Sequence, residues 1–442
     1  MRLIDSLATT PAMAEIFSDA SLLQAMLDFE SALARAEARI GVIPQSAAGT
    51  ITSAARTDVF DAVKLSTESL RAGTLSIPFV KALTERVRSV DPDSARFVHW
   101  GATSQDVADT AIVLLLRRAA KVLAADHARL QQALRQLSEE HSATVMLGRT
   151  LLQPAPPVTF GLKAAGWFGA LRRGWTRLET AFQDAAIVQF GGASGTLAAL
   201  GEHGVAVATA LSDELKLRNP EAPWHAHRDR LAAVNCGCGI YTGSLAKMAR
   251  DIALLMQGEV AEAAEPRSEG RGGSSTMPHK RNPTGCSLAL AAASRVPGLV
   301  AGFLSGMAQE HERGAGGWQA EWTTIARVME DTAVALASMA EVAEGLRVDA
   351  SMMRANLDRT RGLVFAERAM ILLGAALGRD TAHALLERAT QETIASGRKL
   401  VDVIAELPEA ARALSKQQIY TLDEPEAYLG SAEIFRQQLL AP

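Results

Sequence analysis

The sequence predicts an all-α protein with a central bundle of five long helices. Residues 107–141 contain no Gly or Pro, and leucines recur along them every seven positions. This apolar seam consists of Leu116, Leu123, Leu130 and Leu137. A helix of this length spans roughly 50 Å, so its seam needs partner helices along its whole length. No alternating apolar pattern in the chain is long enough to predict a sheet.

Shorter helices precede the long ones, and residues 1–104 are predicted to form an N-terminal helical domain. Its first clear helix lies in the segment SDASLLQAMLDFESALARAEARIG. Ser18 or Asp19 can cap this helix, and Gly41 and Pro44 can stop it.

The predicted central domain covers residues 105–352, and a C-terminal helical domain covers residues 353–442. Besides residues 107–141, four stretches have a long helical periodicity: 158–187, 230–264, 284–312 and 323–350. After Asn356 the helical segments become short again, with breaks at Gly378 and Pro408.

Composition limits the classes of function. The chain has 442 residues, of which 48% are hydrophobic, so it can bury a large core. Its formal net charge of -4 gives no general attraction to nucleic acid or to an anionic membrane, so we expect neither as a partner. The N-terminal segment MRLIDSLATTPAM lacks the apolar core of a signal peptide, and we expect a cytoplasmic protein. The three cysteines, Cys236, Cys238 and Cys286, lack metal-site spacing and are predicted to be buried small residues.

The densest group of candidate functional residues is GRGGSSTMPHKRNP, residues 270–283. Glycines allow backbone conformations closed to other residues, which favours a loop that closes over a ligand. The charges after Met277 are all positive, and with the Asn282 amide they form a receptor for carboxylates or phosphates. A basic surface turn is the alternative interpretation, and the density and mixture of groups favour the anion site.

This loop resembles the GSSxMPxKxNP motif of the fumarase/aspartase superfamily, whose members cleave or form a bond β to a carboxylate. The resemblance implies that Ser275, with Ser274 as the competing assignment, is the catalytic acid or base. It implies that Lys280 and Asn282 hold the substrate. A serine at its ordinary pKa is a poor base, so the cationic loop would have to stabilise its alkoxide. The resemblance also implies a homotetramer of pooled bundles, with active sites shared between subunits.

A second segment, VHWGATSQDVADT, places Thr103 and Ser104 just before the first long helix. Free N–H groups and the helix dipole favour an anion there. Simple N-capping by either hydroxyl, with Asp106 in the first turn, is the competing interpretation. The segment is similar to the superfamily's TSxD segment, which implies that both hydroxyls hold a substrate carboxylate. His99 is predicted to be a packed residue.

A third segment, residues 141–161, resembles the superfamily pattern GRTHLQxAxPxTxG but has Leu151 in place of the histidine. That histidine serves the water, alcohol or amine side of the reaction, and its loss would cost such an enzyme about 10²-fold or more. A carboxylate needs no such proton donor. Its conjugate acid has a pKa of about 4, so at neutral pH it can leave the β carbon, or attack it, as the anion. Among the enzymes of this superfamily, the chain therefore resembles the cycloisomerases, in which one substrate carboxylate adds to a C=C bond of the same molecule.

Such a substrate is a small polycarboxylate, and no metal or organic cofactor is expected. The residues predicted to bind it are Thr103, Ser104, Arg149, Thr150, Gln153, Lys280, Asn282 and Arg313. Arg149 could instead form a structural ion pair. His141 is a candidate for proton transfer, although a buried and satisfied histidine on the helix seam is the stronger interpretation. Trp318 and Trp322 are predicted to pack.

Three alternatives remain. An adenylosuccinate lyase-like elimination is disfavoured by Leu151 and by LATTPAMAEIF in place of a phosphate-binding segment. A catalytically inactive helical scaffold is disfavoured by the intact Ser-Ser-Lys-Asn loop, and a nucleic-acid-binding protein by the net charge. The residues His225, His227, Arg228 and Arg230 form a polar cluster that could reach a neighbour's site or could be a solvated loop.

Overall fold

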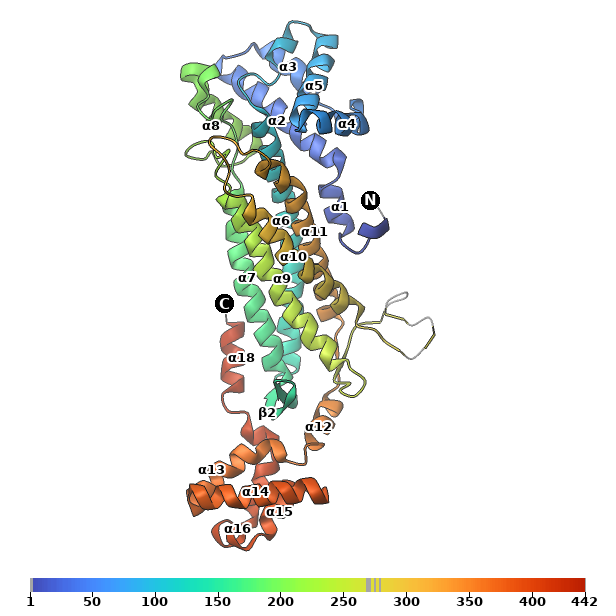
Figure 1. Ribbon diagram of the computed structural model, residues 1–442, viewed down its shortest axis with the longest axis vertical. Helices are drawn as coiled ribbons and strands as arrows, with labels where there is room; N and C mark the ends of the chain where they lie inside the picture. The colour runs from blue at the N-terminus through green and yellow to red at the C-terminus, as the bar shows by residue number, and fades with distance from the viewer. Residues whose placement is uncertain (1–2, 268–271, 274–275, 278–279, 442) are drawn as a thin grey trace. The chain divides into compact units, whose positions relative to one another are not determined.

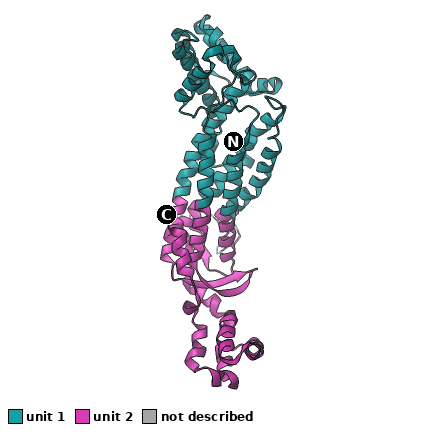
Figure 2. Cartoon of the chain, turned by 90° about the vertical axis from the view of Figure 1, so that its left-hand side faces the viewer, with its two compact units in different colours: residues 1–128, 173–246, 288–338 teal, residues 129–172, 247–287, 339–442 magenta. Residues whose placement is uncertain are grey.

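The structure is a computed structural model that describes residues 3–267, 272–273, 276–277 and 280–441 (Figure 1). Helices dominate it, which confirms the predicted mostly helical fold, and the described residues contain eighteen α-helices and two short two-stranded ribbons. The chain divides into two compact units (Figure 2). Unit 1 contains residues 1–128, 173–246 and 288–338, and unit 2 contains residues 129–172, 247–287 and 339–442. The three predicted domains stay a prediction.

Short helices open the chain, as predicted. They are α1 (Pro11–Ile16), α2 (Asp19–Ile40), α3 (Gln45–Ala54), α4 (Ala62–Ala72) and α5 (Ser76–Val90). The Ser18 hydroxyl caps α2 by accepting a hydrogen bond from the Ser21 N–H at 3.2 Å. Gly41 ends α2 with a φ of 85°, a left-handed conformation that favours glycine. Both predicted helix signals are therefore confirmed.

The five long helices are present, although their ends differ from the predicted ones by up to about nine residues. They are α6 (Ser104–Glu140), α7 (Phe160–Ala185), α9 (Asp229–Leu255), α10 (Thr284–Ser305) and α11 (Gly317–Glu344), and the shorter α8 (Gly204–Leu215) lies between α7 and α9. In α6 the seam residues Leu123 and Leu130 are fully buried, and Leu116 and Leu137 are at most 5% exposed. The heptad pattern therefore marks the packed face of α6.

Residues 145–159 form a β-hairpin, which corrects the prediction of no sheet. Strands β1 (Val145–Thr150) and β2 (Gln153–Thr159) pair antiparallel, with Thr150 opposite Gln153. The turn residues Leu151 and Leu152 have φ values of 50° and 65°, the sign that the two-residue turn of a tight hairpin requires. Prolines in β2 also exclude a helix there. A second ribbon pairs β3 (Ala263–Ala264) with β4 (Arg347–Val348).

The C-terminal helices are short, as predicted. They are α12 (Ala350–Asp358), α13 (Ala366–Leu377), α14 (Arg379–Ser396), α15 (Leu400–Glu406), α16 (Pro408–Ala413), α17 (Lys416–Tyr420) and α18 (Ala432–Leu440). The predicted breaks are confirmed, since Gly378 follows α13 with a φ of 80° and Pro408 is the first residue of α16. Leu385, Leu400 and Ile404 belong to a common apolar core of this region.

Helix α10 is unusually apolar for its degree of burial. It is the one helix of the described chain that is long and apolar enough to cross a membrane, a test that core helices of other proteins also pass. Only 28% of its most apolar window is buried. An apolar helix face left open in one chain is typical of an interface.

Candidate active site

The loop before α6 is held by one buried carboxylate in unit 1. Asp106 accepts hydrogen bonds from the backbone N–H groups of Thr103 (3.0 Å), Gly191 (3.0 Å) and Gly192 (2.9 Å), and its Oδ1 lies 2.7 Å from His225 Nε2. The four contacts join three segments that are far apart in the sequence, at residues 103–106, 191–192 and 225. A side chain at Gly192 is excluded, because its Cβ would lie 2.8 Å from the Gly101 carbonyl oxygen.

Asp106 therefore provides the side-chain contact at the start of α6. The half-buried hydroxyls of Thr103 and Ser104 make no hydrogen bond to any other described residue. This corrects the interpretation in which one of these hydroxyls is the N-cap. It leaves two hydroxyl donors at a helix N-terminus, where the dipole favours an anion.

A second buried network lies one turn further along α6. The Arg228 guanidinium contacts Asp109 at 2.7 Å and Glu321 at 2.6 Å, and all three side chains are at most 2% exposed. Burial lowers the pKa of Arg228, but the two carboxylates raise it by more, so the guanidinium stays charged. Trp318 Nε1 donates to Asp109 Oδ1 at 3.0 Å, and Trp318 packs edge-on against Trp322. The predicted packing of the two tryptophans is confirmed.

This network corrects the solvated-loop interpretation of His225 and Arg228, which are 4% and 2% exposed. Both residues lie in the segment PWHAHRDRL, residues 223–231. Their pairing with Asp106, Asp109 and Glu321 was not visible, because the partners are distant in sequence. A buried arginine requires partners, so Asp109 and Glu321 are the residues that sequence reasoning missed, and Asp106 was named only as an acid of the first turn.

Arg313 lies against the same two loops. Its Nε donates to Gln105 Oε1 at 3.2 Å, and Nη2 donates to the carbonyl oxygens of Gly192 (3.4 Å) and Ala193 (3.1 Å). Its Nη1 makes no hydrogen bond to the described chain. Arg313 thus fixes the 191–193 loop and keeps one donor for a ligand.

His99 is a packed residue, as predicted. Its Nδ1 lies 2.6 Å from Glu30 Oε1, and Glu30 is 1% exposed. Burial lowers the pKa of His99, but the charge of Glu30 and its hydrogen bond outweigh burial and raise the pKa overall. His99 has a positive φ of 61° and lies directly before the loop that Asp106 holds.

In unit 2, Arg149 is bound to a buried acid. Its Nη1 and Nη2 donate to Glu262 at 2.9 and 2.6 Å, and Glu262 is fully buried and also accepts from Asn356 Nδ2 at 2.7 Å. The structure therefore contains the structural ion pair that was the alternative for Arg149. Its Nε makes no hydrogen bond to the rest of the described chain, and substrate binding by Arg149 stays a prediction.

The hairpin presents the other predicted residues of this segment at one tip. Thr150 and Gln153 are exposed and pair across the strands, and Leu151 between them is 97% exposed. Leu152 beside it is 75% exposed, so the tip presents two exposed leucines between Thr150 and Gln153. The position of Leu151 is consistent with a contact to a ligand or to another chain.

His141 follows α6 and is half-buried. Its Nδ1 lies 3.0 Å from Thr144 Oγ1, and its ring packs edge-on against Phe160. Burial lowers the pKa of His141, despite the opposing charge of Glu140, which favours the neutral ring. These contacts favour the packed interpretation, and proton transfer by His141 stays a prediction.

Backbone hydrogen bonding joins the two ends of the candidate loop, residues 270–283. The Asn282 N–H donates to the Gly272 carbonyl oxygen at 3.0 Å, and a side chain at Gly272 is excluded because its Cβ would lie 2.9 Å from the Asn282 carbonyl oxygen. Lys280 is exposed, and its N–H donates to the Met277 carbonyl oxygen at 3.0 Å. The Glu265 carboxylate accepts from the N–H groups of Gly285 and Cys286 and so caps α10. Ser274 and Ser275 lie outside the described residues, and their roles stay predictions.

Comparison with known proteins assigns the chain to a family. A family model described as Lyase matches residues 6–298, and a model described as Adenylosuccinate lyase C-terminus matches residues 362–438. The chain belongs to this lyase family. The match includes the 98–110, 141–161 and 270–283 segments, which agrees with the resemblance inferred from the motifs.

Relatives of this lyase family member cover almost its whole length. A protein of Bradyrhizobium diazoefficiens named 3-carboxy-cis,cis-muconate cycloisomerase is 48% identical over 438 residues, which are 99% of this chain and 97% of that protein. A protein of Streptomyces davaonensis named nitrosuccinate lyase is 42% identical and covers 96% of this chain and 91% of its own length. The crystal structure of the 3-carboxy-cis,cis-muconate lactonizing enzyme from Pseudomonas putida matches with a TM-score of 0.94 and 46% identity, over 100% of this chain and 98% of that one.

Proposed function

We propose that this lyase family member is a 3-carboxy-cis,cis-muconate cycloisomerase, which forms 4-carboxymuconolactone in the breakdown of protocatechuate. The observation that carries the proposal is Leu151 at the exposed hairpin tip, in the position where the superfamily motif has a proton-transferring histidine. A carboxylate nucleophile needs no such histidine. Full-length relatives that bear this enzyme's name support the same reaction. The adenylosuccinate lyase alternative is not favoured.

The reaction needs one bond formation and one proton transfer. A substrate carboxylate oxygen attacks the β carbon of the C=C bond, and the π electron pair moves to the α carbon, where the adjacent carboxylate stabilises it as an enolate. Ser275 donates its hydroxyl proton to the α carbon, and the resulting alkoxide takes a proton from water. The trianion takes up one proton in total and no other atom is gained or lost, so the lactone and the substrate are isomers in their neutral acid forms.

Binding of a trianion requires several donors that keep their positions. The hydroxyls of Thr103 and Ser104 make no hydrogen bond to the described chain, and the Lys280 side chain is exposed. Arg149 and Arg313 are each fixed by two or more contacts, and each keeps one nitrogen for the substrate, Nε of Arg149 and Nη1 of Arg313. Such preorganised donors stabilise the developing enolate without reorganisation. Thr150, Gln153 and Asn282 complete the proposed set.

We place the reaction in the cytoplasm, without metal or organic cofactor, in a homotetramer whose sites combine segments of different subunits. The open apolar surface of α10 supports the oligomer. The proposed set includes residues of both compact units, which is consistent with sites completed by another subunit.

The experiment that tests the proposal follows the ultraviolet absorbance of 3-carboxy-cis,cis-muconate mixed with the purified protein in EDTA. We expect the diene absorbance to disappear and lactone to form, and we expect Ser275→Ala to abolish this turnover. Ser274→Ala is the matched comparison, since it removes the neighbouring hydroxyl. Adenylosuccinate should remain uncleaved. Cleavage of adenylosuccinate without turnover of the muconate would make the lyase assignment correct.

A second candidate reaction is elimination of nitrite from nitrosuccinate, favoured by the relative named for that substrate. Nitrite is also a weakly basic anion that leaves unprotonated, so Leu151 is compatible with both reactions. The same preparation assayed for nitrite release separates them. A kcat/KM for nitrosuccinate above that for the muconate would favour the second reaction.

A further inference from the structure

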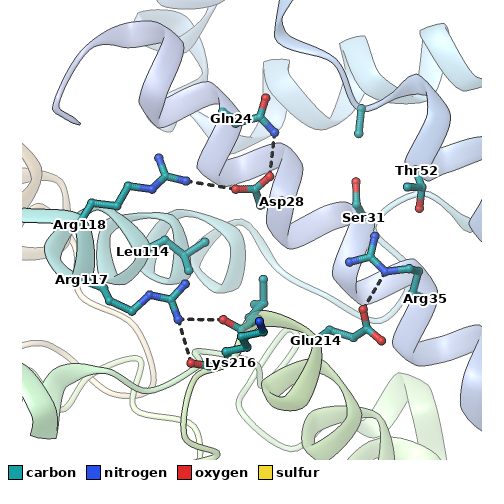
Figure 3. Close-up of a pocket in the computed structure, with 12 residues that line it drawn as sticks. Gln24, Asp28, Ser31, Arg35, Thr52, Leu114, Arg117, Arg118, Glu214 and Lys216 are labelled. Atoms are coloured by element: carbon teal, nitrogen blue, oxygen red, sulfur yellow. Dashed lines mark hydrogen bonds and ion pairs between the residues drawn. The ribbon is translucent and has the colours of Figure 1, made fainter. Parts of the chain in front are cut away.

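Unit 1 contains a cavity of about 410 Å³ that the proposed reaction does not use (Figure 3). It lies between α2, α3, the first half of α6 and the end of α8. Arg117 on its wall is thirteen residues beyond Ser104 on α6, a distance of about 20 Å along the helix. The cavity is therefore separate from the predicted substrate residues at the N-terminus of this helix.

Positive charge exceeds negative charge on the walls. The lining contains four cations and two carboxylates: Arg35, Arg117, Arg118, Lys216, Asp28 and Glu214. Each of the two carboxylates already contacts two other side chains. Glu214 accepts from Arg35 Nε at 2.7 Å and also lies 3.7 Å from Arg39, while Asp28 accepts from Arg118 at 3.2 Å and from Gln24 at 2.7 Å.

Arg117 and Lys216 have no carboxylate partner in the described chain. Arg117 Nη1 donates to the carbonyl oxygens of Leu215 (2.9 Å) and Lys216 (2.8 Å), which orients its guanidinium at the C-terminus of α8. Burial and then the charge of Arg118 lower the pKa of Arg117, and the opposing charge of Asp28 does not offset them. Lys216 is exposed and ends α8 with a φ of 54°. A bound anion would compensate both charges.

Several donors of the lining are unused. Arg35 uses only Nε, and Arg117 only Nη1, in hydrogen bonds to the described residues. The Thr52 hydroxyl is buried without a partner, and the Ser31 hydroxyl makes no hydrogen bond to the rest of the described chain. An unpaired buried hydroxyl costs free energy unless a ligand or water satisfies it. Figure 3 shows Arg35 close to Ser31 and Thr52 on one side of the cavity, and Arg117 beside Lys216 on the other.

We propose that this cavity is a second binding site, which takes a small anion with two or more carboxylate or phosphate charges. The guanidinium groups of Arg35 and Arg117, with Lys216, bind its charged oxygens from two sides, and the Ser31 and Thr52 hydroxyls donate to them. Arginine forks match the geometry of both carboxylate and phosphate groups. The site joins the N-terminal helices to α6, the helix that begins at Ser104, directly after Thr103.

The test is calorimetric titration of the assembled protein at constant ionic strength, with inorganic phosphate and with the tricarboxylate tricarballylate as separate probes. The double variant Arg35→Gln/Lys216→Gln removes two charges from the lining. Arg71→Gln/Lys121→Gln is the matched control, because both residues are exposed, lie on α4 and α6, and line no part of the cavity.

We expect the dissociation constant of at least one probe to rise tenfold or more in the lining variant and to stay within twofold in the control. Binding of phosphate alone or of tricarballylate alone defines the anion class and supports the site. Equal binding to all three proteins, or no binding of either probe, overturns the proposal. If the double variant fails to fold, Lys216→Gln serves in its place, since Lys216 is exposed and forms no ion pair among the described residues.

Discussion

Leu151 is the residue on which the proposed chemistry depends most directly. It is exposed at a turn with positive φ, so it neither fills a core nor stabilises the hairpin. The nearby Arg149, Thr150 and Gln153 are polar, while the adjacent Leu152 is apolar and 75% exposed. A leucine at this position cannot supply the proton that an amine or alcohol leaving group needs. It does not lower the reactivity of a carboxylate nucleophile, which reacts as the anion.

We therefore expect Leu151→His and Leu151→Ala to change kcat/KM for the muconate by less than about tenfold, whereas loss of a general acid or base typically costs 10²-fold or more. Steady-state kinetics with Ser275→Ala as the comparison measures this difference. A loss beyond about a hundredfold in Leu151→Ala would mean that the side chain takes part in the reaction and would contradict the argument.

Glu37 is a buried acid without a hydrogen-bond partner among the described residues. Both of its carboxyl oxygens are buried, and burial, followed by the charge of Glu30, raises its pKa from 4.5 to about 9. Between these two values the native state holds a proton that the unfolded chain has released. Stability therefore falls as the pH rises through this window.

We expect Glu37→Gln, which stays neutral, to be more stable than the native protein at pH 8.5 and to lose most of this advantage at pH 5.5. The change in the free-energy difference between the two proteins is on the order of 3 kcal/mol. Denaturant unfolding at both pH values measures it. The exposed Glu85 supplies the control, and Glu85→Gln should show no such pH dependence. A constant difference between Glu37→Gln and the native protein would show that Glu37 is ionised in the fold.

At the scale of elements, α6 is tied to α9 and α11 by one buried arginine. Arg228 (one residue before α9) bridges Asp109 on α6 and Glu321 on α11, and all of these contacts lie within unit 1. A buried ion pair is weak evidence of net stability, but removal of its cation leaves two uncompensated buried carboxylates. The bridge thus specifies which helix faces meet.

We expect Arg228→Met to destabilise the protein by about 3–5 kcal/mol, measured by denaturant unfolding. The exposed pair of Arg56 and Asp58 offers a control, and Arg56→Met should change stability by an amount too small to measure. Arg228→Met with native stability would mean that the carboxylates protonate without cost, and the bridge would then have no structural role.

At the scale of the whole molecule, the open apolar face of α10 is the feature that a single chain leaves unexplained. Ala291, Ala301 and Leu304 are exposed on this helix. Such a surface is stable in water when another chain covers it. The proposed tetramer would bury it and would bring segments of different subunits to one active site.

We expect the native protein to elute as four copies of the 46.9 kDa chain in size-exclusion chromatography with light scattering. Ala301→Arg, which places a charge on α10, should shift the mass to smaller species and lower turnover in parallel. Ala395→Arg, at an exposed position of the C-terminal helix α14, should change neither. A dissociated but fully active Ala301→Arg protein would contradict shared active sites.

The sequence alone determined the features that depend on local periodicity and on motifs. Sustained heptads specify long helices, Ser18 and Gly41 specify the ends of α2, and the three motif segments specify the family. These signals are local because helix hydrogen bonds and caps join residues close in sequence.

Only the tertiary structure decided the features that depend on distant partners. The hairpin at residues 145–159 forms because its strands pair with each other and its turn adopts positive φ, against the helical pattern of the chain around it. His225 and Arg228 are buried because Asp106, Asp109 and Glu321 compensate their polar groups, and these partners lie about 90 or more residues away in sequence. Burial of charge is a property of the packed fold, and no local pattern encodes it.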